Sequence, residues 1–269
     1  MTRLTTDDLK KGPQDLKAYD QRLKAITGLG LLELALATTD MTLEQYKLRA
    51  AALSWVAVIP ITTGQGIISG FSEKVAEVGC FLGLPCRITN GRDVAGLGEA
   101  VAGGSEIIIL GDDDTFLALN LISRRLVDNA VATGQIYAAA LAAAAGGIAK
   151  RCVAILGLGP VGQAAATWLH SRGAQLIVYD KDQKKQSLFL AERSDVTGAD
   201  SVREILEQTD LVLDATSSPN IIKVRELKRL ILAAPGVPLG IDEPNSDVVQ
   251  LIHDPLQLSV AAMAVQALA

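Results

Sequence analysis

Short apolar runs alternate along the chain with longer segments in which apolar residues recur at helical spacing. The short runs are rich in β-branched residues and are typical of buried strands. We expect strands at 55–59, 86–89, 106–110 and 151–157, and helices at 71–82, 94–103 and 116–127. Strands that alternate with helices predict parallel β-α units and therefore an α/β fold.

Further helices are expected at both ends of the chain and in its middle. Turn signals such as Gly12-Pro13 and Gly28 end the first two segments. The expected helices cover 7–12, 16–28, 42–53, the Ala-rich stretch 129–150 and the apolar C-terminal stretch 256–268. Later strands are expected at 175–179, 211–213 and 237–241, where they can extend a second sheet.

Composition excludes several classes of protein. The 269 residues carry a net charge of −5 and only 4% aromatic residues, which argues against nucleic-acid binding. The longest apolar stretch, 136–149, has 14 residues, whereas a membrane-spanning helix needs roughly 20. The N-terminus has no apolar signal region, so we expect a cytoplasmic protein that contacts no membrane. Three cysteines and two histidines are too few for a disulfide framework or a Cys/His zinc site.

A glycine-rich turn follows the expected strand 151–157. In Gly157-Leu158-Gly159-Pro160-Val161-Gly162, the first glycine permits the tight turn, the second admits a pyrophosphate, and the third lets helix and strand pack closely. The N-terminus of the following helix offers free N–H groups to phosphates. Asp180 lies 23 residues beyond Gly157 at a strand end, where a carboxylate binds a ribose diol and repels a 2′-phosphate. The motif therefore predicts NAD rather than NADP, although Lys181, Lys184 and Lys185 weaken that preference.

The motif divides the chain into two predicted domains. Residues 1–130 form an N-terminal domain with helices and a small parallel sheet, and 131–150 form a connecting helix. Residues 151–254 form a C-terminal NAD-binding Rossmann domain, and 255–269 form a C-terminal helix. Thr216, Ser217 and Pro235 follow later strands of the Rossmann domain and can face the nicotinamide half of the cofactor, or belong to ordinary turns.

Two loops of the N-terminal half follow expected strands directly, at the sheet edge where ligands of parallel sheets gather. One loop holds Thr62, Thr63 and Gln65, and the other holds Asp112, Asp113, Asp114 and Thr115. Three adjacent carboxylates repel one another, which raises the pKa of some of them unless a cation or an amine is near. An amine substrate would satisfy them, so we expect at least one Asp to touch substrate.

A second interpretation of the acidic loop is structural. One Asp or Thr115 can cap the helix expected at 116–127, and the other carboxylates can favour its dipole. We expect no metal there, because neither a histidine nor a distant carboxylate accompanies the triplet. Asn120 can face the cleft or solvent. His170, His253 and the three cysteines are expected to serve packing or local structure.

Three stretches together resemble the pyrrolysine synthase (PylD) family of NAD-dependent dehydrogenases. They are 58–73 (VIPITTGQGIISGFSE, which includes Ser72), 112–120 (DDDTFLALN) and 157–162 (GLGPVG). Residues 4–9 and 27–29 also look like that family, whereas 253–256 match it loosely.

The resemblance implies the last step of pyrrolysine biosynthesis. The implied substrate is lysine joined through its ε-nitrogen to 3-methylornithine; NAD takes a hydride from the carbon bearing the terminal amine, and the oxidised end closes on the ornithine α-amine with loss of ammonia. It also implies that an N-terminal helix closes over the site, so that Leu4 approaches cofactor or substrate.

Two alternatives remain open from the sequence. An amino-acid or shikimate-type dehydrogenase has the same layout but expects a Lys–Asp pair, and neither candidate loop contains lysine. A non-catalytic NAD-binding module is the other alternative.

The Ala-rich helices and the apolar C-terminal helix are compatible with a homodimer.

Overall fold

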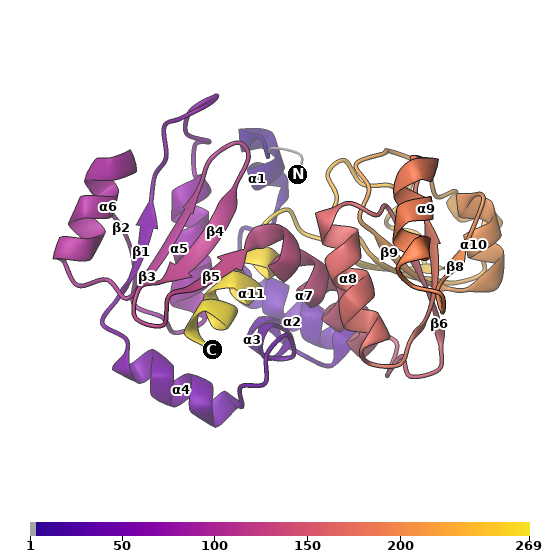
Figure 1. The fold of residues 1–269 in the computed structure, drawn as a ribbon, viewed down its shortest axis with the longest axis horizontal. Helices are drawn as coiled ribbons and strands as arrows, with labels where there is room; N and C mark the ends of the chain where they lie inside the picture. The colour runs from indigo at the N-terminus through magenta and orange to yellow at the C-terminus, as the bar shows by residue number, and fades with distance from the viewer. Residues whose placement is uncertain (1–3) are drawn as a thin grey trace.

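The computed structural model describes residues 4–269, and two β-sheets lie on either side of a central layer of helices (Figure 1). The first sheet belongs to the N-terminal half of the chain and the second to the C-terminal half. The α/β class is therefore confirmed. The exact domain limits at residues 130, 150 and 254 stay predictions.

The N-terminal sheet is mixed rather than wholly parallel. Its order is β2-β1-β3-β4-β5, with β1, β2 and β3 parallel and β4 and β5 antiparallel to their neighbours. The strands are β1 (Val56–Ile59), β2 (Cys86–Ile88), β3 (Ile107–Gly111), β4 (Phe116–Asn120) and β5 (Arg125–Asp128).

The helix expected at 116–127 is wrong, because this segment forms the antiparallel strands β4 and β5. Leu117 and Leu119 lie on one face of the sheet, and Ala118 is buried on the other, so both faces of β4 are apolar. A strand without polar alternation cannot be told from a helix by periodicity alone. Its pairing with β3, in the register Ile109↔Ala118, decides the outcome.

The C-terminal sheet has the strand order of a dinucleotide-binding fold. All its neighbours are parallel, in the order β11-β10-β9-β6-β7-β8. The strands are β6 (Cys152–Leu156), β7 (Gln175–Tyr179), β8 (Thr197–Gly198), β9 (Leu211–Asp214), β10 (Leu230–Ala233) and β11 (Val249–Ile252). The chain reverses direction across the sheet between β6 and β9, and such a switch point is where this fold binds its ligand.

One strand of the C-terminal sheet was misplaced by the sequence interpretation. The strand expected at 237–241 is a loop, from which only Ile241 makes a bridge, to Ile222. The sheet instead continues with β10 and β11.

Helices fill the space between and around the sheets. They are α1 (Thr6–Lys11), α2 (Leu16–Thr27), α3 (Leu31–Leu36), α4 (Leu43–Ala52), α5 (Phe71–Phe81), α6 (Asp93–Ala102), α7 (Asn129–Ala144), α8 (Pro160–His170), α9 (Gln183–Ala191), α10 (Val202–Gln208), α11 (Gln257–Leu268) and the short 3-10 helix η1 (Val224–Glu226). The sequence interpretation missed α3, α9 and α10. The helix expected to reach residue 150 ends at Ala144, because Gly146 and Gly147 adopt positive φ.

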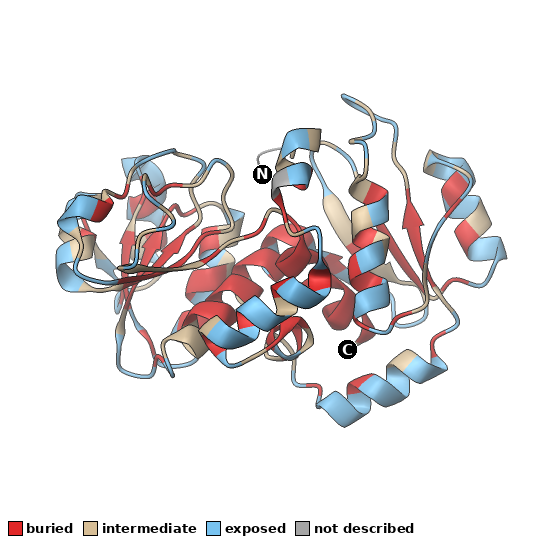
Figure 2. Cartoon of the chain, turned by 180° about the vertical axis from the view of Figure 1, so that it is seen from behind, coloured by how far each residue is buried: buried red, intermediate tan, exposed pale blue. Residues whose placement is uncertain are grey.

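The two most apolar helices form the centre of the molecule. Every residue of α11 is buried, and α11 packs against α7, α3 and α5 (Figure 2). The small Ala side chains of α7 and α11 let the two backbones approach closely. These helices are therefore internal, and the reason given above for a homodimer does not hold. Within residues 4–269, no helix combines the length and apolar character needed to cross a bilayer.

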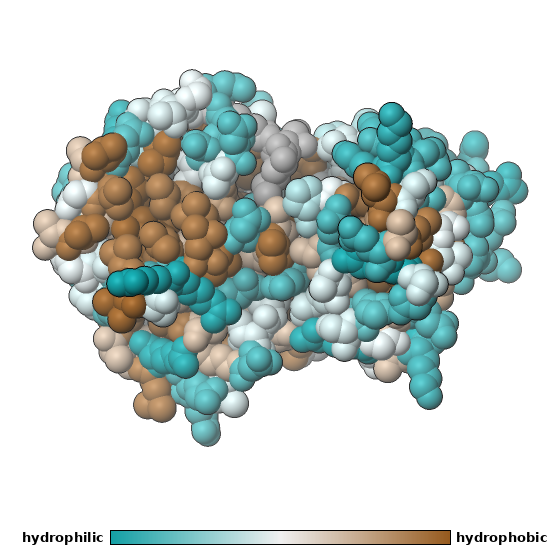
Figure 3. All heavy atoms as spheres, viewed as in Figure 1, coloured by the Kyte–Doolittle hydropathy of each residue, from teal (hydrophilic) through white to brown (hydrophobic). Residues whose placement is uncertain are grey.

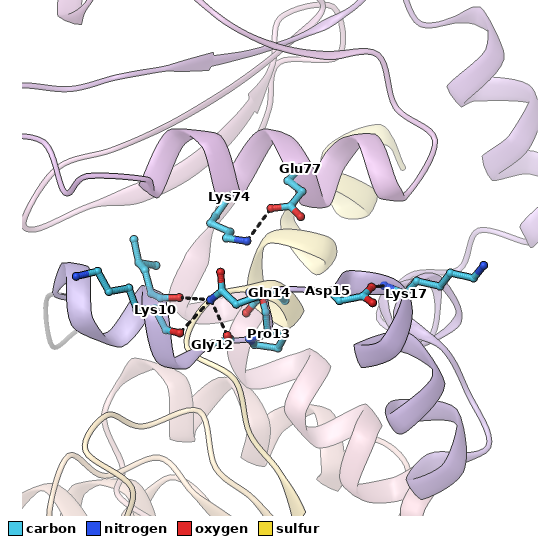
Figure 4. A network of polar contacts seen from close by, with 10 residues as sticks. Lys10, Gly12, Pro13, Gln14, Asp15, Lys17, Lys74 and Glu77 are labelled. Atoms are coloured by element: carbon cyan, nitrogen blue, oxygen red, sulfur yellow. Dashed lines mark hydrogen bonds and ion pairs between the residues drawn. The ribbon is translucent and has the colours of Figure 1, made fainter.

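A side-chain amide ends α1 and sets the turn into α2 (Figure 4). The Gln14 amide nitrogen donates to the backbone oxygens of Leu9, Lys10 and Gly12 at 2.9–3.1 Å. The Asp15 carboxylate then caps α2 by accepting from the N–H groups of Lys17 and Ala18. Behind the turn, Gly12 lies against Pro255, which leaves no room for a Cβ. This turn fixes α1, and with it Leu4, relative to the rest of the molecule.

Candidate active site

A cavity of about 750 Å³ lies between the carboxyl ends of the two sheets. Its walls come from the loops after β1 and β3 on one side and the loops after β6, β7, β9 and β10 on the other. Leu4 lines it from the N-terminal segment, and its approach to cofactor or substrate stays a prediction. A volume of this size suits a dinucleotide together with a small substrate.

The glycine turn forms one end of the cavity. Gly157 has φ +86°, and a Cβ there would meet Thr216 and the Ala215 carbonyl at about 3.0–3.1 Å. Gly159 lies against open space and lines the cavity, and it is the N-cap of α8 without a side-chain cap. The remaining N–H groups of the first turn of α8 are thus left for a ligand. Pro160 has no N–H, but at this position its absence costs no helical hydrogen bond. These features fit a pyrophosphate.

Gly162 and Leu158 contribute in a different way. A Cβ on Gly162 would collide with the Gly157 carbonyl oxygen, so this glycine permits helix–strand packing. Leu158 is fully buried, and its N–H donates to Asp180. Neither residue lines the cavity, whereas Gly157, Gly159, Pro160 and Val161 do.

Asp180 lies at the end of β7, at the cavity wall. One carboxylate oxygen accepts from the Leu158 N–H at 2.7 Å and the other from the Asp182 N–H at 2.8 Å. Each oxygen keeps a lone pair for a ribose hydroxyl. Lys181 and Lys185 line the same end. Thr216, Ser217 and Pro235 also line the cavity, and their contact with the nicotinamide half stays a prediction.

The acidic loop is the turn of the β3–β4 hairpin, so it caps no helix. Asp112 accepts from the N–H groups of Asp114 and Thr115 at 2.9 and 2.7 Å. These hydrogen bonds lower the pKa of Asp112, the N–H of Thr115 contributing most, which is opposite to the mutual repulsion expected from the sequence. Among residues 4–269, no group of three His, Cys, Asp or Glu side chains is arranged to hold a metal ion.

Asp113 fastens this hairpin to the other candidate loop. Its carboxylate accepts from the Gln65 N–H at 2.7 Å and lies directly against Gly64, which has φ +70°. Both the left-handed backbone and the contact require glycine at this position. The acidic hairpin and the Thr-rich loop are therefore held together as one wall of the cavity.

Replacing Gly64 by alanine is expected to lower the free energy of unfolding by more than the left-handed strain of about 1–2 kcal/mol, because the new Cβ also displaces Asp113. Gly70→Ala is the matched control, since Gly70 has φ +83° but nothing within 4 Å of a Cβ. Urea unfolding of both variants measures the difference. Equal losses would show that the Asp113 contact contributes nothing.

The remaining predicted residues divide into two groups. Thr63, Ser72, Asp112, Asp113, Asp114 and Thr115 all line the cavity. Thr62, Gln65 and Asn120 do not: the Thr62 hydroxyl and N–H donate to Asp93, and the Asn120 amide donates to the Ala267 carbonyl at 3.0 Å. Asn120 stands on β4 rather than on a helix, so its side chain points to α11 instead of the cleft.

The sequence interpretation missed a buried polar cluster at the floor of the cavity. The Asp254 carboxylate accepts from the Tyr19 hydroxyl and from the N–H groups of Leu256 and Leu258. The Tyr137 hydroxyl donates to the Asp254 carbonyl at 2.7 Å. Burial raises the pKa of Asp254 and of both tyrosines. The sequence Asp254-Pro255 before an apolar helix is a visible signal for a helix start. The sequence gives no sign of its partners Tyr19 and Tyr137, because both lie more than 100 residues away.

An apolar wall also lines the substrate half of the cavity. The rings of Phe71 and Phe116 pack edge to face with centroids 5.2 Å apart, and a Cβ on Gly111 would press on Phe116. Ile67 and Ile68 extend this wall. The substrate half therefore presents apolar side chains as well as the carboxylates of the hairpin.

Asp214, at the end of β9, gives a test of buried charge. It is 1% exposed, and burial raises its pKa despite hydrogen bonds from Thr216. An acid with a raised folded pKa binds its proton more tightly when folded, so its contribution to stability is largest at low pH and falls as pH rises from 3.8 to the folded pKa. Asparagine does not titrate, so Asp214→Asn should not show this decline in the free energy of unfolding.

The free energy of unfolding of the wild type is thus expected to fall relative to Asp214→Asn as pH rises from about 4 to about 7. Urea titrations across this range measure it, with Asp200→Asn at an exposed site as the control. A constant difference between wild type and Asp214→Asn would contradict the raised pKa.

Comparisons with known proteins agree with this geometry. Residues 8–127 match the family described as "Pyrrolysine biosynthesis protein PylD, N-terminal domain". Residues 117–229 match "D-isomer specific 2-hydroxyacid dehydrogenase, NAD binding domain". The pyrrolysine synthase of Methanosarcina barkeri is 31% identical over 98% of this chain and 97% of its own length, and that of Methanosarcina acetivorans is 28% identical over 98% of each.

Solved structures share the fold at low identity. Shikimate dehydrogenase from Aquifex aeolicus has a TM-score of 0.53 at 12% identity and covers 80% of this chain and 90% of its own. Quinate dehydrogenase from Corynebacterium glutamicum in complex with NAD has a TM-score of 0.52 at 15% identity, covering 80% and 92%. The glycine turn and the matched domain make this chain an NAD-dependent oxidoreductase. With relatives aligned over almost its full length, the chain belongs to the pyrrolysine synthase family.

Proposed function

We propose that the protein oxidises the terminal amine of 3-methylornithyl-N6-lysine and closes the oxidised end on the ornithine α-amine. The relatives are named pyrrolysine synthases, and pyrrolysine contains the ring that this reaction forms. A cytoplasmic setting, where NAD and free amino acids are available, suits this reaction.

One observation carries the proposal. A single cavity is lined both by the glycine turn, which suits a dinucleotide, and by a carboxylate that is not engaged in holding the described fold together. Asp112 is engaged in its own turn, and Asp113 fastens the neighbouring loop. Asp114 lines the same cavity as Gly157 and Gly159, and it is exposed. We therefore assign to Asp114 the contact with the reacting amine.

The division of labour follows from the two walls. Residues 1–130 supply the substrate wall and 151–254 the cofactor wall, with 131–150 as the connecting segment and the helix within 255–269 packed beneath. Glycine backbone and Asp180 would hold the cofactor. When bound there, NAD supplies the acceptor for a hydride.

The chain's own groups then prepare the amine. Asp114 accepts one proton from the terminal ammonium, and the neutral amine can lose a hydride from its carbon, which leaves an iminium. The α-amine attacks this carbon, and the bond to the terminal nitrogen breaks so that ammonia leaves and a C=N bond remains in the ring. The apolar wall of Phe71, Phe116 and Ile67 excludes water, which would otherwise hydrolyse the iminium.

A shikimate-type reaction is less compatible with the cavity. Within the described part of the chain, the lysines that line it are Lys181 and Lys185, which follow β7 at the cofactor end. The substrate wall presents carboxylates instead, which suit an ammonium.

The test is NADH formation, followed by absorbance, with the lysine–methylornithine isopeptide as substrate and mass spectrometry of the product. We expect NADH and a product that has lost ammonia; lysine and shikimate should give no NADH. A folded, NAD-binding protein that does not turn over the isopeptide would overturn the proposal. In that case, turnover of shikimate would support the runner-up dehydrogenase, and no turnover at all would support a binding module.

A further inference from the structure

Helix α6 has an unusual exposed face, because no charged residue lies on it. Val94, Leu97 and Val101 are 81%, 41% and 55% exposed, and they recur at helical spacing. Ala95, Gly98 and Ala102 are the other exposed positions of this helix. Its two charged residues turn to their own loops: Asp93 accepts from Thr62, and Glu99 accepts from the N–H groups of Asn90 and Gly91. A helix that is apolar on every side is typical of one buried on every side.

Beside α6, on the same face of the N-terminal sheet, the part formed by β4 and β5 is not covered by any described helix. The inner face of α6 packs on β1 and on Ile108 of β3. The register places Leu119 opposite Ile108 and Leu126 opposite Leu119, so all three side chains share the α6 face of the sheet. Leu126 is 60% exposed, and Leu119 is half-buried. Figure 3 shows apolar side chains gathered over this part of the sheet.

We propose that two copies of this chain form a closed dimer in which α6 of each copy covers β4 and β5 of the other. A two-fold axis parallel to the strands places the two α6 helices side by side between two facing sheets. The inner face of each α6 then packs on its own β1 and β3, and its outer face packs on the partner's bare strands. One operation therefore covers both apolar surfaces, and the interface closes on itself.

The charges at the rim fit this arrangement. Leu121 N–H donates to the Glu106 carbonyl, so the β4–β5 turn lies at the same end of the sheet as the C-terminus of α6. That turn carries Arg124, which is exposed and makes no ion pair within the described residues. An axis parallel to the strands keeps this end together in both copies. Arg124 therefore lies at the same end as the negative C-terminus of the partner's α6.

The exposure and the position of the surface also suit a second copy. The four large aliphatic side chains exposed on α6 and β5 are each more than 40% accessible, and exposed apolar patches of this kind mark protein–protein contacts. The surface lies on the sheet face, whereas the cavity lies at the carboxyl ends of β1 and β3. Dimerisation therefore leaves the cavity open.

Light scattering coupled to size-exclusion chromatography tests the dimer. We expect the wild type to have twice the mass of one chain, and Leu97→Lys and Leu126→Glu each to halve it. Both substitutions lie at exposed positions of one copy, so folding, measured by circular dichroism, and NAD affinity should be unchanged. Leu188→Glu, at a 70% exposed position of α9 outside this surface, is the matched control and should remain dimeric.

Mixing the two variants tests the arrangement itself. In a mixed dimer, the lysine at position 97 meets the glutamate at position 126 of the other chain, and the second contact keeps both leucines. The mixture should therefore regain the dimer mass, which no merely destabilised protein would do. A monomeric wild type, dimers that survive both substitutions, or folded variants that do not pair on mixing would overturn the proposal.

Discussion

Asp114→Asn is expected to lower kcat by about 10²–10⁴-fold, because it removes the group that takes the proton from the reacting amine. Asparagine has the same shape but cannot accept that proton. Among residues 4–269, the Asp114 side chain has no hydrogen bond or ion pair that holds the fold, so the free energy of unfolding should be unchanged. The affinity for NAD should also be unchanged, since Asp114 stands on the substrate wall.

The neighbouring carboxylates supply the controls for this experiment. Asp112→Asn keeps an oxygen that can accept from the N–H groups of Asp114 and Thr115, so its kcat should fall far less. Asp113→Asn weakens the link to the Gln65 loop and should act mainly on KM. A variant at Asp114 with wild-type kcat, or a larger loss at Asp112, would move the proton acceptor elsewhere in the hairpin. Steady-state NADH formation measures all three.

Gly159→Val is expected to weaken NAD binding by about 10–100-fold without unfolding the protein, through a steric cost of about 1–3 kcal/mol. Gly159 has φ −70° and ψ −178°, an extended backbone that any residue adopts. No atom of the described residues 4–269 lies within 4 Å of a Cβ there, so the free protein has room for the side chain. The same space is where the turn would admit a pyrophosphate.

Gly162→Ala is the matched comparison for Gly159→Val. Its Cβ would collide with the Gly157 carbonyl oxygen, so this variant should lose stability instead. Calorimetric titration with NAD and thermal unfolding separate the two effects. Unchanged NAD affinity in Gly159→Val would show that the cofactor does not approach this turn.

How much could be predicted differs between the two halves of the chain. The cofactor half was largely predictable, because the glycine turn acts through local backbone: Gly157, Gly159 and Asp180 need only a strand before them and a helix after. The substrate half was not. There the same residues, Asp112 to Thr115, change from a helix cap to a hairpin turn according to how the next segment pairs.

The sequence by itself determined the α/β class, the dinucleotide turn, the acidic loop and the family, because each depends on residues that are neighbours in the chain. Only the tertiary structure decided that β4 and β5 are strands, that Asn120 turns to α11, and that Asp254 meets Tyr19 and Tyr137. Those outcomes depend on which surfaces become buried together. The partners of Asn120 and Asp254 lie more than 100 residues away, and β4 is decided by its pairing with β3 and its packing against α11. Local pattern holds no record of either.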